Sequence, residues 1–597
     1  MLKSVSTILP ALAILFMSIN TKAQQHRTDI SFEVSFSEPQ AHYADVEMNI
    51  DNIKSNQIVL KMPVWAPGSY LIREFAKNVE GFTATANNQE ISFEKVRKNA
   101  WKIETKGKKS ITVKYRVYCF EVSVRTSFVD ASHAFLSPTG IFMYPENGIN
   151  QPSTVKVIPH VNWKKVSTAL AEVPGEKFTY HAKNFDWLFD SPIEVGNQDV
   201  FEFNAAGVQH TVAMVGGGNY DKERLKKDMA KIVERETAVF GENPNSNYLF
   251  IVHNQQSGGG GLEHLNSTVL GASREGYTDE KTYKNFLSLV AHEYFHLWNV
   301  KRLRPVALGP FDYDNENYTT NLWVAEGFTA YYDNIMVERI GAYTADEWLG
   351  IIEDDINAVE NRSGNNTQTL SQASFDAWIK SYRPNENTSN TTVSYYVKGS
   401  LIACLLDLEI INASDAKFSL DDAMRYAYNE FYKKKGTGYT DAEFKMVLEK
   451  FTKSNLNQFY ADYINGTKKL DFDKYLRYAG FSLTEKPAAP DKPYLGITLN
   501  KGTNEIASVS RNTAAWDCGL NVNDKIIEIN GEQVESPLAY VNDKKVGDDL
   551  VFLVNRDGIL KSFKVKLRAS AAKKFQIKQL DNTNEKQKAV LEKWLSL

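Results

Sequence analysis

The pattern of hydrophobic and polar positions changes its period twice along the chain. In the first third, apolar residues alternate with polar ones, as in residues 30–36 (ISFEVSF) and 111–118 (ITVKYRVY). This period of two, carried by β-branched and aromatic residues, predicts half-buried β-strands. Over about residues 220–478 the apolar positions recur at helical spacing, and short strand-like runs return over 494–567. We therefore expect a β-domain, a mainly helical domain and a second, β-rich domain.

The length of 597 residues favours several domains, because a single hydrophobic core rarely grows this large. A proline-rich run over 487–493 (PAAPDKP) predicts a linker before the last β-rich domain. The final residues place Val590, Leu591 and Trp594 at helical spacing. We expect a multidomain α+β protein divided into residues 24–203 (all-β), 204–486 (mainly α-helical), 487–570 (β-rich) and a helical tail over 571–597.

The first 23 residues have the three parts of a secretory signal peptide. Lys3 supplies the positive start, residues 8–17 an apolar core, and residues 21–23 (TKA) a small-x-small cleavage site. A buried N-terminal helix is the alternative. Neither this run nor any later one reaches the roughly 20 apolar residues that a membrane span needs. We expect a signal peptide over 1–23 and a secreted or periplasmic protein without a transmembrane span.

Composition narrows the classes of partner. Hydrophobic residues make up 43% of the chain and charged residues 24%, which is typical of a soluble globular protein. The formal net charge of −4 gives no electrostatic reason to expect nucleic acid or an anionic membrane as a partner. Only three cysteines occur, far apart at Cys119, Cys404 and Cys518. Disulfides are therefore not expected to define the fold.

The most specific chemical signal is the run over 292–296 (HEYFH). His292 and His296 are four residues apart, so on a helix both imidazoles reach one metal ion. Glu293 between them is placed to take a proton from a water molecule on that metal. The preceding apolar run over 286–291 predicts a buried helix. A structural helix with two hydrogen-bonded histidines is the alternative.

A third ligand has to come from elsewhere in the chain. The extended metzincin pattern requires Gly at position 299 and His at 302, where Asn299 and Arg302 stand. A downstream carboxylate is therefore expected to complete the site, and Glu326, within residues 322–327 (LWVAEG), is the candidate. Its apolar neighbours favour an inward position over a surface glutamate.

These residues resemble the glycyl aminopeptidase family of PDZ-containing zinc metallopeptidases, which is related to the aminopeptidase N-like gluzincins. The resemblance covers nearly all of the mature chain and is carried by residues 292–302 (HEYFHLWNVKR), residues 63–70 (PVWAPGSY) and the C-terminal segment. It implies a thermolysin-like catalytic domain over 204–486 and a PDZ-like domain over 487–570. It also implies one Zn²⁺ ion held by His292, His296 and Glu326.

The resemblance implies two further site elements. Residues 396–399 (YVKG) match a Tyr-x-Lys-Gly segment whose tyrosine stabilises the oxyanion, which assigns Tyr396, with Tyr395 as its nearest competitor. Residues 258–264 (GGGGLEH) resemble the Gly-x-Met-Glu-Asn segment, in which an edge strand holds the substrate backbone and the glutamate binds the free α-amine. That assigns substrate binding to Gly260, Gly261 and Glu263.

The glycine-rich segment departs from the family pattern at two positions. Leu262 replaces Met and His264 replaces Asn. A flexible glycine loop with a solvated Glu263 is therefore the alternative to an amine anchor. For Tyr396 the alternative is a tyrosine of the helical core.

Other residues near the motif have two possible roles each. Asp333, about two turns after Glu326, is either the hydrogen-bond partner of a ligand histidine or an exposed helix acid. Arg302 and Arg304 either meet a substrate carboxylate or, as the safer interpretation, form structural ion pairs. The loop over 65–70 is a candidate roof for the cleft or an ordinary packing turn.

The C-terminal β-rich segment resembles a PDZ domain. Residues 494–497 (YLGI) resemble its carboxylate-binding loop, and residues 519–531 its inner hairpin. A C-terminal peptide ligand is implied, and a purely structural module is the alternative.

Together these features predict a zinc aminopeptidase that acts on short peptides, with Glu293 as general base. The resemblance implies a preference for small first residues such as Gly or Ala. The alternatives are a zinc endopeptidase on unfolded chains and a PDZ-based peptide-binding scaffold with an inactive metal site. The sequence leaves the oligomeric state open.

Overall fold

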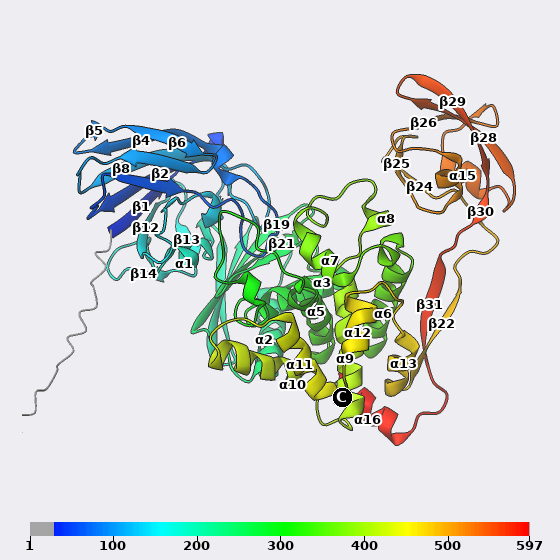
Figure 1. The fold of residues 1–597 in the computed structure, drawn as a ribbon. Helices are drawn as coiled ribbons and strands as arrows, with labels where there is room; N and C mark the ends of the chain where they lie inside the picture. Colours follow the sequence, from blue (N-terminus) through cyan, green and yellow to red (C-terminus); the bar gives the residue numbers. More distant parts are fainter. Residues whose placement is uncertain (1–28, 596–597) are drawn as a thin grey trace, which may run out of the picture.

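The computed structural model describes residues 29–595. The predicted signal peptide lies outside this range. Figure 1 shows an N-terminal β-domain, a central helical domain and a C-terminal β-rich domain in sequence order, with the last domain standing off on a pair of long strands. The predicted α+β organisation is confirmed.

The N-terminal domain is built on one large sheet whose strands follow the predicted alternation. In β1 (Asp29–Ser35) and β2 (Tyr43–Asp51) every second residue is buried, and the register pairs Phe32 with Met48 and Val34 with Val46 on the inner face. In spatial order the strands are β14 (Ala171–Glu172), β15 (Thr179–Ala182), β12 (Ser153–Ile158), β1 (Asp29–Ser35), β2 (Tyr43–Asp51), β8 (Ile111–Tyr118), β4 (Val79–Ala86) and β5 (Gln89–Glu90).

Two four-stranded sheets complete the domain and share its hydrophobic core. One of them consists of β13 (Lys165–Thr168), β16 (Ile193–Gly196), β10 (Ala134–Leu136) and β9 (Phe128–Val129). The other consists of β11 (Tyr144–Pro145), β3 (Gln57–Lys61), β7 (Ala100–Glu104) and β6 (Phe93–Arg97), and a short helix α1 spans Phe185–Phe189.

The central domain begins with a five-stranded sheet. The preceding sheet ends with Gly196 and the strand Asp199–Ala205 already pairs in this one, so the change of sheet falls between residues 196 and 199, before the predicted boundary at 203. The strand Gly261–Glu263 runs antiparallel to its neighbour and forms one edge. The spatial order is β17 (Asp199–Ala205), β18 (Val208–Val215), β19 (Asn247–Gln255), β21 (Ser267–Ser273) and β20 (Gly261–Glu263).

Helices pack against this sheet and against one another, with α3 (Glu280–Phe295), α5 (Gly327–Arg339) and α9 (Val397–Ala413) at the centre (Figure 1). Helix α9 is buried along almost its whole length, as expected for the middle of a large core. The helices are α2 (Lys222–Phe240), α3 (Glu280–Phe295), α4 (Leu322–Ala325), α5 (Gly327–Arg339), α6 (Ala345–Glu360), α7 (Leu370–Phe375), α8 (Thr388–Thr391), α9 (Val397–Ala413), α10 (Leu420–Ala427), α11 (Asp441–Thr452), α12 (Asn457–Phe459) and α13 (Phe472–Leu476).

The C-terminal domain has its own small core, which includes Ile506 and Phe552. It contacts the central domain where Asn390 of α8 donates to the carbonyl of Val509 at 2.9 Å. Its elements are β23 (Pro493–Tyr494), β24 (Ile497–Leu499), β25 (Ile506–Val509), α14 (Ala514–Cys518), β26 (Lys525–Ile529), β27 (Glu532–Gln533), α15 (Pro537–Asn542), β28 (Asp549–Arg556), β29 (Ile559–Lys566) and β30 (Arg568–Ala569).

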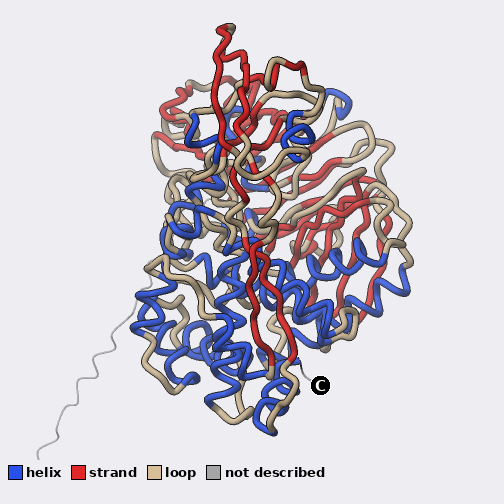
Figure 2. The backbone as a smooth tube through the Cα atoms, turned by 90° about the vertical axis from the view of Figure 1, so that its right-hand side faces the viewer, coloured by secondary structure: helices blue, strands red, loops and turns tan. Residues whose placement is uncertain are grey.

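A two-stranded ribbon joins this domain to the rest and corrects the predicted tail. Strand β22 (Phe481–Pro487) pairs antiparallel with β31 (Lys573–Gln579), so residues 573–579 are a strand and not part of a helix. Phe575 and Ile577 alternate with polar residues there, and a partner about 90 residues earlier supplies the hydrogen bonds. The predicted helix follows as α16 (Glu585–Leu595). Figure 2 shows the two strands running side by side along the molecule.

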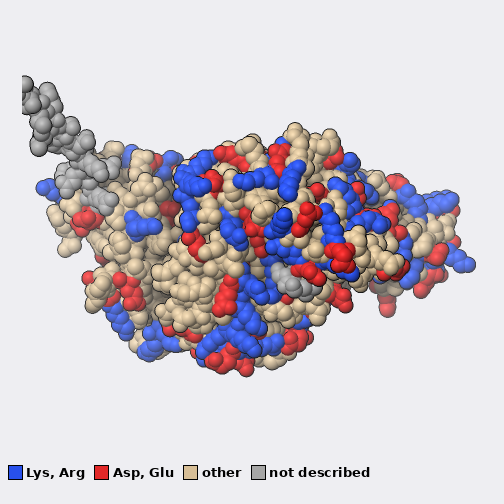
Figure 3. All heavy atoms as spheres, turned by 90° about the horizontal axis from the view of Figure 1, so that it is seen from below, with Lys and Arg blue, Asp and Glu red and all other residues tan. Residues whose placement is uncertain are grey.

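The surface and the cysteines agree with the composition. On the face in Figure 3, basic and acidic side chains are interspersed, without one field of a single sign. No helix within residues 29–595 has the length and apolar character to cross a membrane. All three cysteines are free.

Candidate active site

The metal motif lies at the end of a helix whose start is well defined. The carboxylate of Asp279 accepts a hydrogen bond from the amide of Thr282 at 2.9 Å and caps α3. The apolar residues over 286–291 bury the helix, as predicted. His292 lies in its last turn and His296 directly at its end, with ring centroids 4.8 Å apart.

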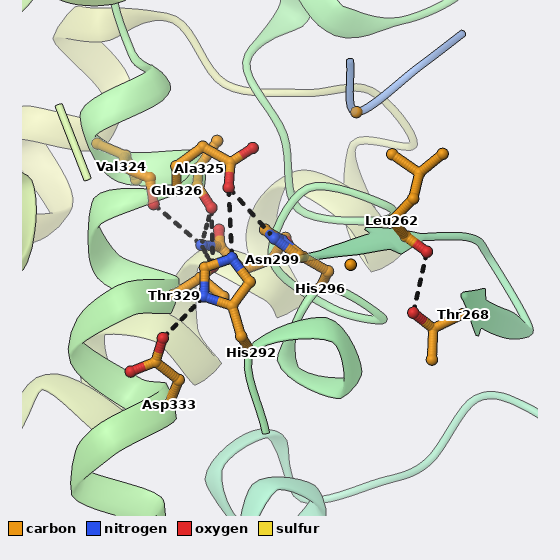
Figure 4. A network of polar contacts seen from close by, with 12 residues as sticks. Leu262, Thr268, His292, His296, Asn299, Val324, Ala325, Glu326, Thr329 and Asp333 are labelled. Carbon is orange, nitrogen blue, oxygen red and sulfur yellow. Dashed lines mark hydrogen bonds and ion pairs between the residues drawn. The ribbon is translucent and has the colours of Figure 1, made fainter. Parts of the chain in front are cut away.

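Glu326 reaches both histidines from a break between two helices. It lies between α4 and α5, and its Oε2 is 3.6 Å from His292 Nε2 and 3.3 Å from His296 Nε2 (Figure 4). Burial acts to raise the pKa of Glu326, but the two adjacent histidines outweigh it and hold the pKa below its usual range. The carboxylate is therefore an anion at neutral pH.

The far nitrogen of each ring is held by another group. His292 Nδ1 lies 2.8 Å from Asp333 Oδ2, and His296 Nδ1 lies 2.9 Å from the carbonyl of Asn299. These acceptors favour a proton on each Nδ1, which leaves both Nε2 lone pairs facing Glu326. Asp333 is 8% exposed, so the alternative of an exposed helix acid is wrong.

Asn299 fixes the distance between the two ligand elements. Its side-chain amide donates to the carbonyls of Val324 and Ala325 at 3.0 and 3.2 Å and to Thr329 Oγ1 at 3.0 Å (Figure 4). It thus ties the end of α3 to α4 and α5. The position that a metzincin would give to glycine is used here to align Glu326.

The donor set fits a zinc ion. One nitrogen from each histidine and one oxygen of Glu326 lie within 4.8 Å of one another, so one ion can contact all three. Two imidazoles and a carboxylate are the ligands that a catalytic zinc site uses when it keeps one position open for water. Glu263, Glu293 and His296 also converge within 4.8 Å, but that set has a single imidazole.

Glu293 is buried next to the candidate metal position. It is 4% exposed, and its Oε2 has no hydrogen-bond partner among the described residues. Burial raises its pKa to about 7. A Cβ at Gly261 would lie 2.2 Å from Glu293 Oε1, so only glycine lets the edge strand come this close.

Glu263 lies on the same edge strand, under a loop of the N-terminal domain. It is 4% exposed and lines a cavity of about 320 Å³ together with the histidines. A Cβ at Gly68 would lie 2.6 Å from each oxygen of Glu263 and 2.7 Å from Leu262 Cδ1. The loop over 65–70 therefore covers this part of the cavity, and Glu263 is not a solvated loop residue.

The two candidate tyrosines have different surroundings. Tyr396 lines the cavity, and its ring centroid is 6.2 Å from that of His292. Tyr395 stacks behind it at 4.8 Å, is 1% exposed and does not line the cavity. Close packing of Gly327 against Gly399 brings α9 to α5, because a Cβ at Gly327 would lie 2.5 Å from Gly399 Cα.

Arg302 and Arg304 are structural, but not through ion pairs. Arg302 donates to the carbonyl of Leu297 at 2.7 Å and to Asn245 Oδ1 at 2.6 Å. Arg304 packs over the ring of Phe311 at 5.1 Å. Within residues 29–595 neither arginine lines the cavity or pairs with Glu326. The expected structural role is therefore right, but the expected ion pairs are not formed.

The charged cavity residue Arg125 was not predicted from the sequence. Arg125 comes from the N-terminal domain, and its Nη2 donates to the carbonyl of Gly261 at 3.1 Å. It belongs to no motif and is 136 residues from Gly261 in sequence, so no local signal could have found it.

A His-Glu-x-x-His helix with a glutamate from the following helical segment is the donor set of a zinc metallopeptidase. The chain matches three family profiles: the Peptidase M61 N-terminal domain over residues 31–197, M61 glycyl aminopeptidase over 285–402, and a PDZ domain over 493–567. The chain thus carries both domains of the M61 glycyl aminopeptidase family together with a PDZ domain, and it is a metallo-aminopeptidase.

Solved structures with the same fold include an aminopeptidase N family protein from Idiomarina loihiensis. It has 29% sequence identity and a TM-score of 0.87, and the match covers 95% of this chain and 100% of that one. An M1 zinc metallopeptidase from Deinococcus radiodurans, at 12% identity and a TM-score of 0.47, covers 75% of this chain and 96% of its own. That likeness is too distant to inform the site. The search of curated sequences found no significant match.

Proposed function

We propose that this enzyme removes single N-terminal residues, preferably Gly or Ala, from short peptides. His292, His296 and Glu326 would hold one zinc ion, which would activate a water molecule and polarise the scissile carbonyl. The observation that carries the proposal is the convergence of these three donors beneath an edge strand that bears Glu263.

Glu293 is proposed as the general base. Its unpartnered oxygen and its raised pKa, about 7, suit a group that accepts a proton from the attacking water near neutral pH. The same carboxyl would then deliver that proton to the leaving amine.

Tyr396 is proposed as the donor to the oxyanion of the tetrahedral state. It lines the cavity beside His292, whereas Tyr395 lies behind it. A well-placed donor of this kind stabilises the transition state by about 3 kcal/mol.

Glu263 is proposed to bind the substrate α-ammonium, which would confine cleavage to the first peptide bond. Its carboxylate lies within 4.8 Å of Glu293 and His296, so the bound amine would be about one residue from the reacting carbonyl. The close cover of Gly68 over Leu262 and Glu263 leaves little room beside that amine and supports a small first residue.

The test is the hydrolysis of glycyl and alanyl anilides beside leucyl anilide and N-acetylated versions, each with and without a chelator. The proposal expects chelator-sensitive cleavage of the free-amine substrates only, faster for glycyl and alanyl than for leucyl. Equal cleavage of blocked substrates would favour the endopeptidase alternative. Equal rates for all first residues would remove the size preference.

We propose that the C-terminal domain captures peptides with a free C-terminal carboxylate. Within residues 29–595, β24 pairs only with β25, so one edge of β24 is left for an added strand. Binding of labelled peptides should be lost on C-terminal amidation, and equal binding of acid and amide would reject the proposal.

Export is proposed from the N-terminal residues alone, since Lys3, the apolar run and residues 21–23 match the pattern of a signal sequence. N-terminal sequencing of the protein from its native cell should begin near residue 24. A chain that begins at residue 1 would contradict export by cleavage.

A further inference from the structure

A guanidinium from the N-terminal domain enters the catalytic cavity. Arg125 lies between β8 and β9, where Val124 is buried in a small hydrophobic cluster with Leu262 of the edge strand. Thr126 Oγ1 donates to the carbonyl of Glu121 at 3.0 Å and holds the other side of the loop. The loop is thus fixed against β20, and Arg125 lines the cavity together with Glu263 and Glu293.

Arg125 forms no close ion pair within the described residues, although Glu263 and Glu293 line the same cavity. No carboxylate in this part of the chain lies within 4.0 Å of it, and its buried Nε has no hydrogen-bond partner. Within the described residues its side chain makes one hydrogen bond, from Nη2 to the carbonyl of Gly261. By contrast, Arg73 of the same domain lies 3.3 Å from Glu121. A guanidinium that is largely removed from water normally has an anion beside it.

The position of Arg125 along the edge strand sets the length of peptide that it can meet. The general base Glu293 lies against Gly261, so a peptide whose amine is at Glu263 must run toward Gly261 to present its first peptide bond. Gly261 and Glu263 are two residues apart, which is about 7 Å along a strand. That distance is about the span from the amine to the carboxylate of an extended dipeptide.

From this geometry we infer that Arg125 binds the C-terminal carboxylate of a dipeptide substrate, opposite Glu263, and that dipeptides with a free carboxylate are the preferred substrates. The inference rests on the proposed aminopeptidase function. A Cβ at Gly260 would lie 3.8 Å from Arg125 Nη1, so this nitrogen lies beside the edge strand on the side of Gly261 that is away from Glu263. In a tripeptide the carboxylate moves about 3.4 Å further along the strand and away from Arg125.

The experiment compares glycyl-phenylalanine, its C-terminal amide and glycyl-phenylalanyl-glycine as substrates of the full-length zinc-loaded enzyme. The wild type should have the highest kcat/KM for the free dipeptide. Arg125→Gln should lower kcat/KM for that substrate by about 10- to 100-fold, mainly through KM, as expected when a charge-assisted hydrogen bond is lost. The amide should change much less, and Arg125→Lys should recover part of the loss.

The matched control is Arg116→Gln, which removes a half-buried arginine of the same domain that pairs with Glu38 at 3.1 Å and with Asp45 at 3.3 Å. It should leave the ratio of acid to amide unchanged. Equal cleavage of acid and amide by the wild type would overturn the inference, as would an equal loss on both substrates in Arg125→Gln. If these results accompany cleavage of glycyl anilide but not its N-acetyl form, the aminopeptidase function stands and only the role of Arg125 fails. No cleavage of any free-amine substrate would reject the proposed function itself.

Discussion

Two places in this molecule combine a buried glutamate with two histidines, and they differ in which ring nitrogens of the histidines face the glutamate. In the cavity, His292 and His296 turn Nε2 toward Glu326, while other groups hold their Nδ1 atoms. At the boundary between the first two domains, Glu194 has one histidine on each oxygen, His133 Nδ1 at 2.8 Å and His253 Nε2 at 3.0 Å.

The difference lies in the elements that carry the side chains. His292 and His296 are one turn apart on α3, whereas β16, β19 and the residue before β10 each supply one member of the other cluster. In the second cluster both oxygens of Glu194 are used by direct hydrogen bonds, so no set of donors is left to converge on an ion. Identical residue types therefore build a candidate metal site in one place and a structural link between domains in the other.

The largest effect should come from removing a ligand. His296→Ala should lower bound zinc to near zero and reduce activity by more than about 1,000-fold, because two remaining donors hold zinc poorly. Metal analysis and anilide hydrolysis measure both quantities. Full activity with normal zinc content would remove His296 from the site.

Glu293→Gln should keep zinc but lower kcat by roughly 100- to 10,000-fold, since it removes proton transfer and leaves the ligands in place. Zinc content and kcat are measured on the same preparation. Retained turnover would reject the role of general base.

Tyr396→Phe should lower kcat by roughly 100-fold with little change in KM, because the hydroxyl acts on the transition state. Tyr395→Phe is the matched control, since Tyr395 stacks on Tyr396 outside the cavity. A larger loss in the control would reverse the assignment of the two tyrosines.

Asp333→Asn should weaken zinc binding by about 10- to 100-fold, because the carboxylate that orients His292 is lost. Competition with a chromophoric chelator measures this affinity. An unchanged zinc affinity would make Asp333 a structural partner only.

The smallest effect on catalysis should come from Glu194→Gln, with zinc content and kcat unchanged but stability reduced by about 2 kcal/mol. Burial acts to raise the pKa of Glu194, but the two histidines outweigh it and lower the pKa below 4.5, so its contribution is lost as the pH falls through that lowered value. Burial acts to lower the pKa of His133, but Glu194 outweighs it and raises the pKa above 6.5, so its contribution is lost as the pH rises through that raised value.

The stability difference between wild type and Glu194→Gln should therefore be largest between pH 4.5 and 6.5 and smaller at pH 8. Thermal unfolding at pH 5.5 and 8 measures it. A loss of zinc in this variant would contradict the separation of the two clusters.

Much of the site could be predicted because its signals are local. The spacing of His292, Glu293 and His296 follows from the helical period, and the apolar residues around Glu326 favour an inward glutamate. The strands of the N-terminal domain likewise follow from the alternation seen in residues 30–36. These features depend on neighbours within a few turns or one strand.

Only the tertiary structure decided the contacts between distant segments. The sequence alone determined the motif, the order of the domains and the residues able to bind metal. It could not choose between Tyr395 and Tyr396, bury Asp333 against His292 or bring Arg125 to Gly261, 136 residues away. Helical and strand periods are set by the backbone of adjacent residues, whereas these approaches depend on how whole domains pack.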